Sequence, residues 1–131
     1  MDKLDLIKYW IDTSDQDYIT MIHLYESKDF NWSLFIGHLV IEKLLKALYV
    51  QNIDSNVPKT HDLLRLAGTE NLELTDEQQD TLDIITTFNI SARYPDYKQS
   101  FNKKCTNKFT HSNIEKIKEM RLWLLGLLTV K

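Results

Sequence analysis

Apolar residues recur every three or four positions along much of the chain, which is the spacing of one face of an α-helix. This pattern predicts a first helix over residues 4–27 and a second over residues 32–51, with Asn31 as the N-cap of the second. No stretch of useful length alternates between apolar and polar residues, so we expect no β-strand. The chain is therefore predicted to be all-α.

Capping signals place the remaining helices. Thr60 is expected to cap a short helix over residues 61–67. Two capping boxes, Thr75–Gln78 and Ser112–Glu115, predict helices that continue to about residues 92 and 127. Pro95 stops the first of these, and the basic segment 97–109 is expected to form one or two helical turns. We predict a single domain over residues 1–131, folded as an up-and-down bundle of five or six helices.

The second predicted helix is apolar on nearly every side, so we expect it in the centre of the bundle. With the last helix it would also form a homodimer interface, because one bundle would not cover all of its apolar surface. Its polar residues His38, Glu42 and Lys46 are four apart and share one stripe, with Lys43 beside them. Either Lys46 neutralises the buried Glu42 in a structural ion pair, or Lys43 and Lys46 face a phosphate at a groove mouth.

Composition excludes several kinds of site. The lone Cys105 allows neither an intramolecular disulfide nor a CxxC metal site, and the four histidines are far apart in sequence. The three glycines are isolated, so there is no glycine-rich phosphate loop, and neither HExxH nor GxSxG occurs. We therefore expect no metal and no cofactor. Charged residues interrupt the most apolar stretch, so we expect no membrane span. The N-terminus lacks the apolar core of a signal peptide, which favours a cytoplasmic protein.

Charge is divided unevenly along the chain. Residues 1–92 carry 7 basic and 16 acidic side chains, whereas residues 93–131 carry 9 basic and 3 acidic ones. One interpretation is a basic patch of Lys98, Lys103, Lys104 and Lys108 that faces phosphate groups. The other interpretations are acidic helices that pack beside a basic one, or a head-to-tail match of charges within a dimer.

Two segments at helix ends hold candidate ligand-binding residues. In the first, residues 58–63, His61 either lies beside an anion at a helix N-terminus or merely packs at the helix start. The second, residues 91–98, holds Arg93, Tyr94, Asp96 and Tyr97 in one helix-ending turn. A guanidinium can donate two parallel hydrogen bonds to a phosphate, and tyrosine rings can stack on a base. The structural alternative is an Arg93–Asp96 pair that locks the turn.

These segments, in this order, resemble the HEPN (higher eukaryotes and prokaryotes nucleotide-binding) domain family. Residues 35–48 resemble its long second helix, with the Glu-Lys-x-x-Lys-Ala core at Glu42–Ala47. Thr60–Leu63 resembles its threonine-histidine-aspartate/asparagine-leucine segment, and Arg93–Asp96 resembles the arginine-tyrosine-proline segment of one branch. The resemblance spans about residues 5–128 and implies an up-and-down helical bundle that is usually a homodimer.

The resemblance implies two kinds of activity. Many members are ribonucleases that use an arginine followed four to six residues later by a histidine, with both protomers forming one site. Others bind nucleotides or RNA without catalysis, and many bacterial members are encoded beside a minimal nucleotidyltransferase as toxin–antitoxin pairs. In this chain Tyr97 follows Arg93 four residues on, and no arginine has a histidine at that spacing. His61 or His111 would have to come close to Arg93 in the folded protein to take the role of the missing histidine.

We therefore predict a HEPN-like domain that binds a nucleotide, RNA or a nucleotidyltransferase-type partner, without clear catalysis of its own. The alternatives are a metal-independent ribonuclease toxin with a divergent site, and a module that only binds other proteins. In the ribonuclease, Arg93 would stabilise the phosphorane, and a further group would take the 2′-hydroxyl proton. The expected ligand contacts are Arg93, Tyr94, Asp96, Tyr97, Lys43, Lys46 and His61.

Overall fold

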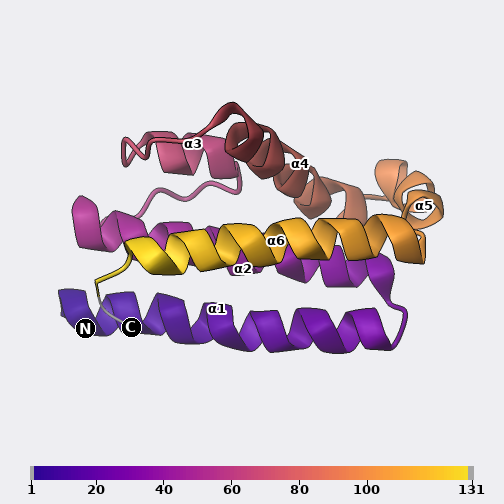
Figure 1. The fold of residues 1–131 in the computed structure, drawn as a ribbon, viewed down its shortest axis with the longest axis horizontal. Coiled ribbons are helices and arrows are strands. Elements are labelled where there is room, and N and C mark those ends of the chain that lie inside the picture. Colours follow the sequence, from indigo (N-terminus) through magenta and orange to yellow (C-terminus); the bar gives the residue numbers. More distant parts are fainter. Residues whose placement is uncertain (1, 130–131) are drawn as a thin grey trace.

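The computed structural model describes residues 2–129, and within them the chain forms six α-helices and no strand (Figure 1). The α1–α2 hairpin is antiparallel, and the last helix lies beside it and brings the C-terminus back to the end of the bundle that holds the N-terminus (Figure 1). This confirms the all-α bundle expected from the sequence. The helices are α1 (Lys3–Glu26), α2 (Phe30–Asn52), α3 (Leu63–Gly68), α4 (Asp76–Arg93), α5 (Pro95–Lys104) and α6 (Asn107–Leu127).

The central helix of the bundle is α2, which packs against each of the other five. Its side chains Leu34, Ile41, Leu44, Leu45 and Leu48 have no exposed surface. The single bundle already covers most of its apolar residues, so the expectation that α2 needs a second copy of the chain is wrong. Although α2 is this apolar, no helix within residues 2–129 is long and apolar enough to span a membrane.

Close backbone approach joins α2 to its neighbours. The hydroxyl of Ser14 on α1 donates to the Val40 carbonyl oxygen at 2.8 Å, so that a buried hydroxyl is satisfied across the hairpin. On the other side, α6 approaches α2 at Gly37. A Cβ on Gly37 would lie 2.5 Å from Cδ1 of Ile117, which is closer than side chains pack, so the glycine is what permits this contact.

Two helices begin earlier than their sequence signals indicate. The N-cap of α2 is Asp29, so Asn31 lies inside the helix rather than capping it. The N-cap of α6 is Thr106, whose side chain accepts a hydrogen bond from the Phe109 backbone. The capping box expected at Ser112 is therefore wrong, because Ser112 already lies within α6.

The other helix ends follow the sequence more closely. Thr75 and Gln78 form the expected capping box at the start of α4. Pro95 ends α4 as expected and is also the first residue of α5, a position where proline needs no hydrogen-bond partner for its nitrogen. The N-cap of α3 is Asp62 rather than Thr60, which accepts instead from the backbone nitrogen of Asp62. His61 consequently lies outside the helix and is free to pack against α2.

Candidate functional site

One face of α2 carries a row of polar side chains at the spacing of successive helical turns. At its centre, the carboxylate of Glu42 accepts a hydrogen bond from Lys46 Nζ at 3.0 Å and another from His61 Nδ1 at 2.7 Å. His61 comes from the loop before α3, so this carboxylate ties that loop to α2. We call this surface the α2 face; it comprises Phe35, His38, Glu42 and Lys46, with Arg93 and His61 packed against it.

Glu42 remains charged although it is almost entirely buried. Burial alone would raise the pKa of its carboxyl group. The hydrogen bonds from His61 and Lys46, together with the positive charge of Lys46, outweigh burial and hold the pKa of Glu42 below its ordinary value. The structural ion pair between Glu42 and Lys46 that the sequence left open is therefore present.

His38 lies beside Glu42 with none of its surface exposed. Its Nε2 is 2.8 Å from the carbonyl oxygen of His61, and a carbonyl only accepts, so Nε2 carries the proton. The buried Nδ1 has no hydrogen-bond partner within residues 2–129. Burial lowers the pKa of His38, and the charge of Arg93 adds to this effect, so the ring is neutral at neutral pH. His38 thus serves to position the His61 loop and is too deeply buried to touch a large ligand.

The side chain of His61, in contrast, is 62% exposed. Its Nδ1 is the nitrogen that meets Glu42, which leaves Nε2 as the ring nitrogen available to a ligand. A buried carboxylate that fixes one imidazole nitrogen orients the other. His61 was chosen from the sequence as a residue near an anion site; the structure adds that Glu42 holds it.

Arg93 is the last residue of α4, and Asn89, one turn earlier, holds its guanidinium. Nε donates to the Asn89 carbonyl oxygen at 3.0 Å, and Nη2 donates to Asn89 Oδ1 at 2.6 Å. The guanidinium carbon lies 5.6 Å from the centre of the Phe35 ring on α2 and 5.3 Å from that of Tyr94. No ion pair joins Arg93 to Asp96 within residues 2–129, so the turn is locked through Asn89 and not through Asp96.

Arg93 and His61 therefore flank His38 on the same side of α2. Arg93 stacks on Phe35, three residues before His38, and its charge influences the pKa of His38. The rings of His61 and His38 are 6.1 Å apart. An exposed imidazole and a guanidinium from two separate elements therefore lie on the same side of α2.

The remaining predicted contacts are spread more widely. Lys43 belongs to a different side of α2, where Nζ donates to Asp17 of α1 at 2.5 Å. Lys46 lies at the far end of the α2 face, with Nζ 5.2 Å from the centre of the Trp10 ring. Tyr94, Asp96 and Tyr97 are exposed around the junction of α4 and α5, next to Arg93 in the chain.

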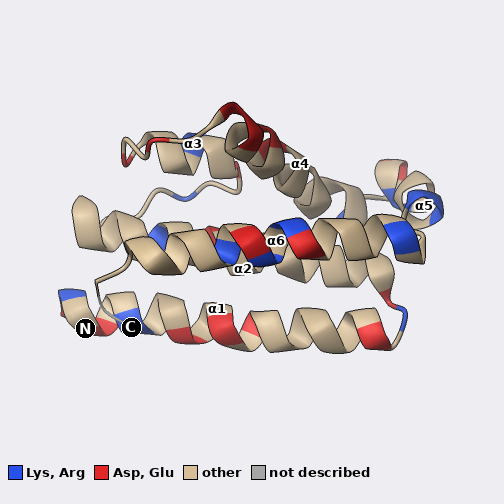
Figure 2. Ribbon diagram, viewed as in Figure 1, with Lys and Arg blue, Asp and Glu red and all other residues tan. Residues whose placement is uncertain are grey.

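The expected basic patch follows α5 and the first turn of α6, where Figure 2 shows lysine and arginine concentrated at one end of the bundle. Lys98 lies over the ring of Trp32 at 4.8 Å, near the start of α2. Lys104 lies over the ring of Phe109 at 5.3 Å. Lys103 and Lys108 are exposed. The four lysines thus share one end of the molecule, although Lys98 faces α2 and Lys104 faces α6.

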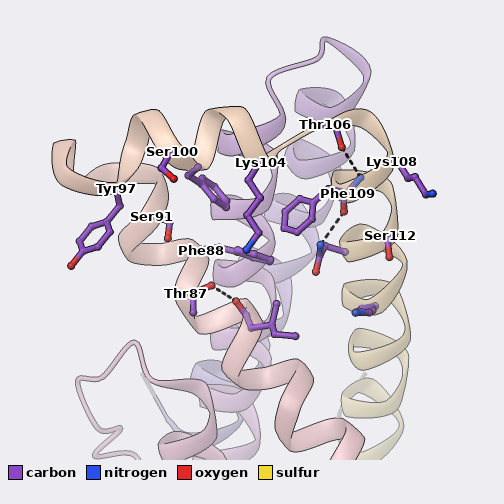
Figure 3. Close-up of a pocket in the computed structure, with 14 residues that line it drawn as sticks. Thr87, Phe88, Ser91, Tyr97, Ser100, Lys104, Thr106, Lys108, Phe109 and Ser112 are labelled. Carbon is purple, nitrogen blue, oxygen red and sulfur yellow. Dashed lines mark hydrogen bonds between the residues drawn. The ribbon is translucent and has the colours of Figure 1, made fainter.

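A pocket of about 700 Å³ opens beside this basic end, between α4, α5 and α6 (Figure 3). Lys104 reaches from α5 across the pocket toward Phe88, whereas Tyr97 and Lys108 point away from its centre (Figure 3). Sequence reasoning did not find the pocket, because its walls come from three helices. It also missed Asn89, although the spacing of one turn between Asn89 and Arg93 was a usable signal. Within residues 2–129, no cluster of three potential ligands could hold a metal ion.

Comparison with known proteins gave one match. The model of a family described as the HEPN domain matches residues 7–127, which is most of the chain. Neither a curated protein nor a solved structure matches it.

Proposed function

The chain belongs to the HEPN domain family, and from this premise we propose that it binds a nucleotide or RNA at the α2 face. Membership supports a nucleotide- or RNA-related function at the level of the family. The observation that carries the finer proposal is the setting of Arg93. Asn89 takes the Nε hydrogen and one of the two Nη2 hydrogens, which leaves both Nη1 hydrogens and the second Nη2 hydrogen for a phosphate.

The groups around Arg93 suit the two parts of a nucleotide. Tyr94 is half-exposed and its ring borders the guanidinium, so that a base can stack on the ring while the phosphate meets Arg93. Because His61 Nδ1 donates to Glu42, its Nε2 is an acceptor that can receive a hydrogen bond from a ribose hydroxyl on the other side of His38. Lys43 and Lys46 already have acidic partners, so we assign them a smaller share of the binding energy.

The proposal is tested by titrating a labelled single-stranded oligoribonucleotide with Arg93→Ala, Arg93→Lys and the charge-matched control Arg65→Ala. Hydrogen bonds to a charged group contribute about 1.5–3 kcal/mol, so Arg93→Ala is expected to weaken binding by roughly 10- to 100-fold. Arg93→Lys should restore only part of the affinity because the planar fork is lost. Arg65 is exposed on α3 and makes none of the contacts of the α2 face, so its removal should leave the affinity within about twofold.

Salt dependence and stability complete the test. Each lost phosphate contact should flatten the slope of log K against log salt by about 0.7 for a single strand. Arg93→Ala also leaves the buried Asn89 oxygen without its partner, which costs about 1–3 kcal/mol of folding stability. Titrations are therefore made at temperatures where thermal melts show every variant folded. Arg93 is excluded as a ligand contact if the folded Arg93→Ala variant binds as wild type does.

A second candidate function is metal-independent RNA cleavage, and the Glu42–His61 pair is the observation that favours it. In that reaction Nε2 of His61 would take the proton of a 2′-hydroxyl as its oxygen bonds to phosphorus, and Arg93 would stabilise the charge on the phosphorane. The bond from phosphorus to the 5′-oxygen would then break, and the 5′-oxygen would take the proton from His61 and leave as a hydroxyl. The carboxylate of Glu42 would hold the imidazole in the required tautomer and stabilise its protonated form.

Cleavage is tested by incubating labelled RNA with the protein in the presence of a metal chelator. If the candidate holds, products with a 2′,3′-cyclic phosphate form, and both His61→Gln and Arg93→Ala abolish them. If wild-type protein binds the RNA but leaves it intact, cleavage is rejected and the binding function is retained. A wild-type protein that binds neither RNA nor a nucleotide would reject both, and would favour a module that binds only other proteins, such as a nucleotidyltransferase-type partner.

A further inference from the structure

The pocket between α4, α5 and α6 is separate from the α2 face. None of the residues that line it comes from α2, and Arg93 is not among them. Its volume of about 700 Å³ falls in the range of small-molecule sites, which is roughly 300–1,000 Å³. The pocket is therefore large enough for a ligand of its own.

The inner part of the pocket is aromatic. Phe88 of α4 and Phe101 of α5 are both buried, and their ring centres are 5.8 Å apart. Phe109 of α6 adds a third ring, which is half-buried. Faces and edges of aromatic rings pack well against a flat ring such as a nucleobase.

The outer part of the pocket is cationic and rich in hydroxyls. Lys104, Lys108 and Lys116 line it, and none of the three makes an ion pair with another side chain in the part of the chain that the structure describes. No carboxylate is among the lining residues. Ser91 and Ser100 supply hydroxyls that can bond to a sugar or to polar atoms of a base. Three lysines without a carboxylate attract an anion to the opening.

We propose that this pocket is a second binding site, which takes a nucleoside phosphate. The base lies against the half-buried ring of Phe109, and the phosphate meets Lys104, the lysine that crosses the pocket (Figure 3). The inference rests on the proposed nucleotide- or RNA-binding function and adds a site that the α2 face does not explain. The same chemistry is offered by a free nucleotide and by a terminal nucleotide of a single-stranded RNA, and the test separates these two sources.

The test measures binding by calorimetry with three probes: ATP, inorganic triphosphate and a short oligoadenylate. Lys104→Gln removes the proposed phosphate contact, and its control is Lys103→Gln, the neighbouring exposed lysine that does not line the pocket. Ser100→Trp fills the pocket from an exposed position on α5, and its control is Asn102→Trp on the same helix outside the pocket. Thermal melts establish that all four variants are folded.

We expect Lys104→Gln to weaken ATP binding by about tenfold, the scale of one charge-assisted hydrogen bond. Ser100→Trp should abolish it, and both controls should stay within about twofold of wild type. ATP should bind more tightly than inorganic triphosphate, because only ATP brings a base to the aromatic floor. If the pocket variants affect the oligoadenylate but not ATP, the source of the ligand is an RNA end.

Two results would overturn the pocket assignment. One is equal binding of ATP and inorganic triphosphate, which would leave no role for the aromatic floor. The other is an equal effect of Lys103→Gln and Lys104→Gln, which would indicate only a diffuse positive field. If RNA binding depends on Arg93, and the pocket variants change the binding of neither ATP nor the oligoadenylate, the pocket proposal fails and the proposed function stands. If the pocket variants lose ATP binding while Arg93→Ala binds RNA as wild type does, the binding site proposed on the α2 face is wrong and the pocket site stands.

Discussion

Glu42 and Glu70 are both buried carboxylates, and their surroundings give them opposite properties. Glu42 receives hydrogen bonds from Lys46 and His61, which hold its pKa below the ordinary value despite burial. Neither carboxylate oxygen of Glu70 has a hydrogen-bond partner within residues 2–129, and burial raises its pKa to about 8. The first carboxylate links the His61 loop to α2, whereas the second contributes no such link and costs stability when it ionises.

The raised pKa of Glu70 predicts that stability falls as the pH rises. Below about pH 4.5 the carboxyl is protonated in both the folded and the unfolded chain, so it costs nothing there. Between pH 4.5 and about 8 only the unfolded chain releases the proton, so the free energy of unfolding decreases over that window. At 1.36 kcal/mol per pH unit the loss reaches on the order of 3 kcal/mol by pH 7.

Glu70→Gln tests this prediction because the amide cannot ionise. Urea unfolding at a series of pH values should show that the variant lacks most of the decrease between pH 4.5 and 8 that wild type shows. The two proteins should approach each other in stability near pH 4. A pH dependence that is identical in the two proteins would mean that Glu70 finds a partner or water in the folded state.

At the scale of the helices, the contact between α2 and α6 depends on Gly37. Its Cβ position would lie 2.5 Å from Ile117 Cδ1 and 3.1 Å from Met21 Sδ, so an added methyl must displace side chains of both α1 and α6. Gly126, near the end of α6, has no heavy atom within 4 Å of its Cβ position. The two glycines therefore form a matched pair, one packed between helices and one in open space.

Gly37→Ala is expected to destabilise the protein, because overpacking costs about 1–3 kcal/mol and better helix propensity returns only about 0.5–1 kcal/mol. Gly126→Ala should leave stability unchanged or raise it by up to about 1 kcal/mol. Chemical denaturation of both variants measures the difference. A Gly37→Ala protein as stable as Gly126→Ala would show that Ile117 and Met21 move aside without cost.

The helices themselves were predictable, and the contacts between them were not. The apolar repeat in α1 and α2 and the capping box at Thr75 placed these helices to within a few residues. Both signals depend only on the spacing of residues that are close in the sequence. The start of α6 was misplaced because Ser112 and Glu115 match a capping box although Thr106 caps the helix. The pairing of His61 with Glu42 and the α4–α5–α6 pocket depend on packing between distant segments, which no local pattern contains.

Across the whole molecule, the uneven division of charge is satisfied internally only in part. Arg121 of α6 pairs with Asp15 of α1 at 3.3 Å, so acidic and basic helices do meet there. The lysines of α5 make no ion pair with acidic side chains in the described part of the chain. Figure 2 shows basic segments on α5 and at the start of α6, so the charge of these lysines is not neutralised within the described part of the chain.

Exposed apolar residues of α1 and α6 are candidates for a homodimer interface. Leu122 is 65% exposed and Ile19 is 56% exposed. Ile19 belongs to α1 and Leu122 to α6, two helices that touch where the Arg121 guanidinium lies 4.2 Å from the Tyr18 ring. Large apolar side chains that remain exposed on neighbouring helices are typical of an interface.

We therefore expect sedimentation to show a dimer at micromolar concentration that Leu122→Glu converts to a monomer. The physical reason is that an apolar interface would have to bury the new carboxylate, at a cost of several kcal/mol without a partner. Ile90→Glu is the control, because Ile90 is also exposed but lies on α4. A wild-type monomer at this concentration would contradict the dimer, and dissociation by Ile90→Glu but not by Leu122→Glu would move the interface to α4. In either monomeric protein the α2 face and the pocket remain complete, since their residues come from one chain.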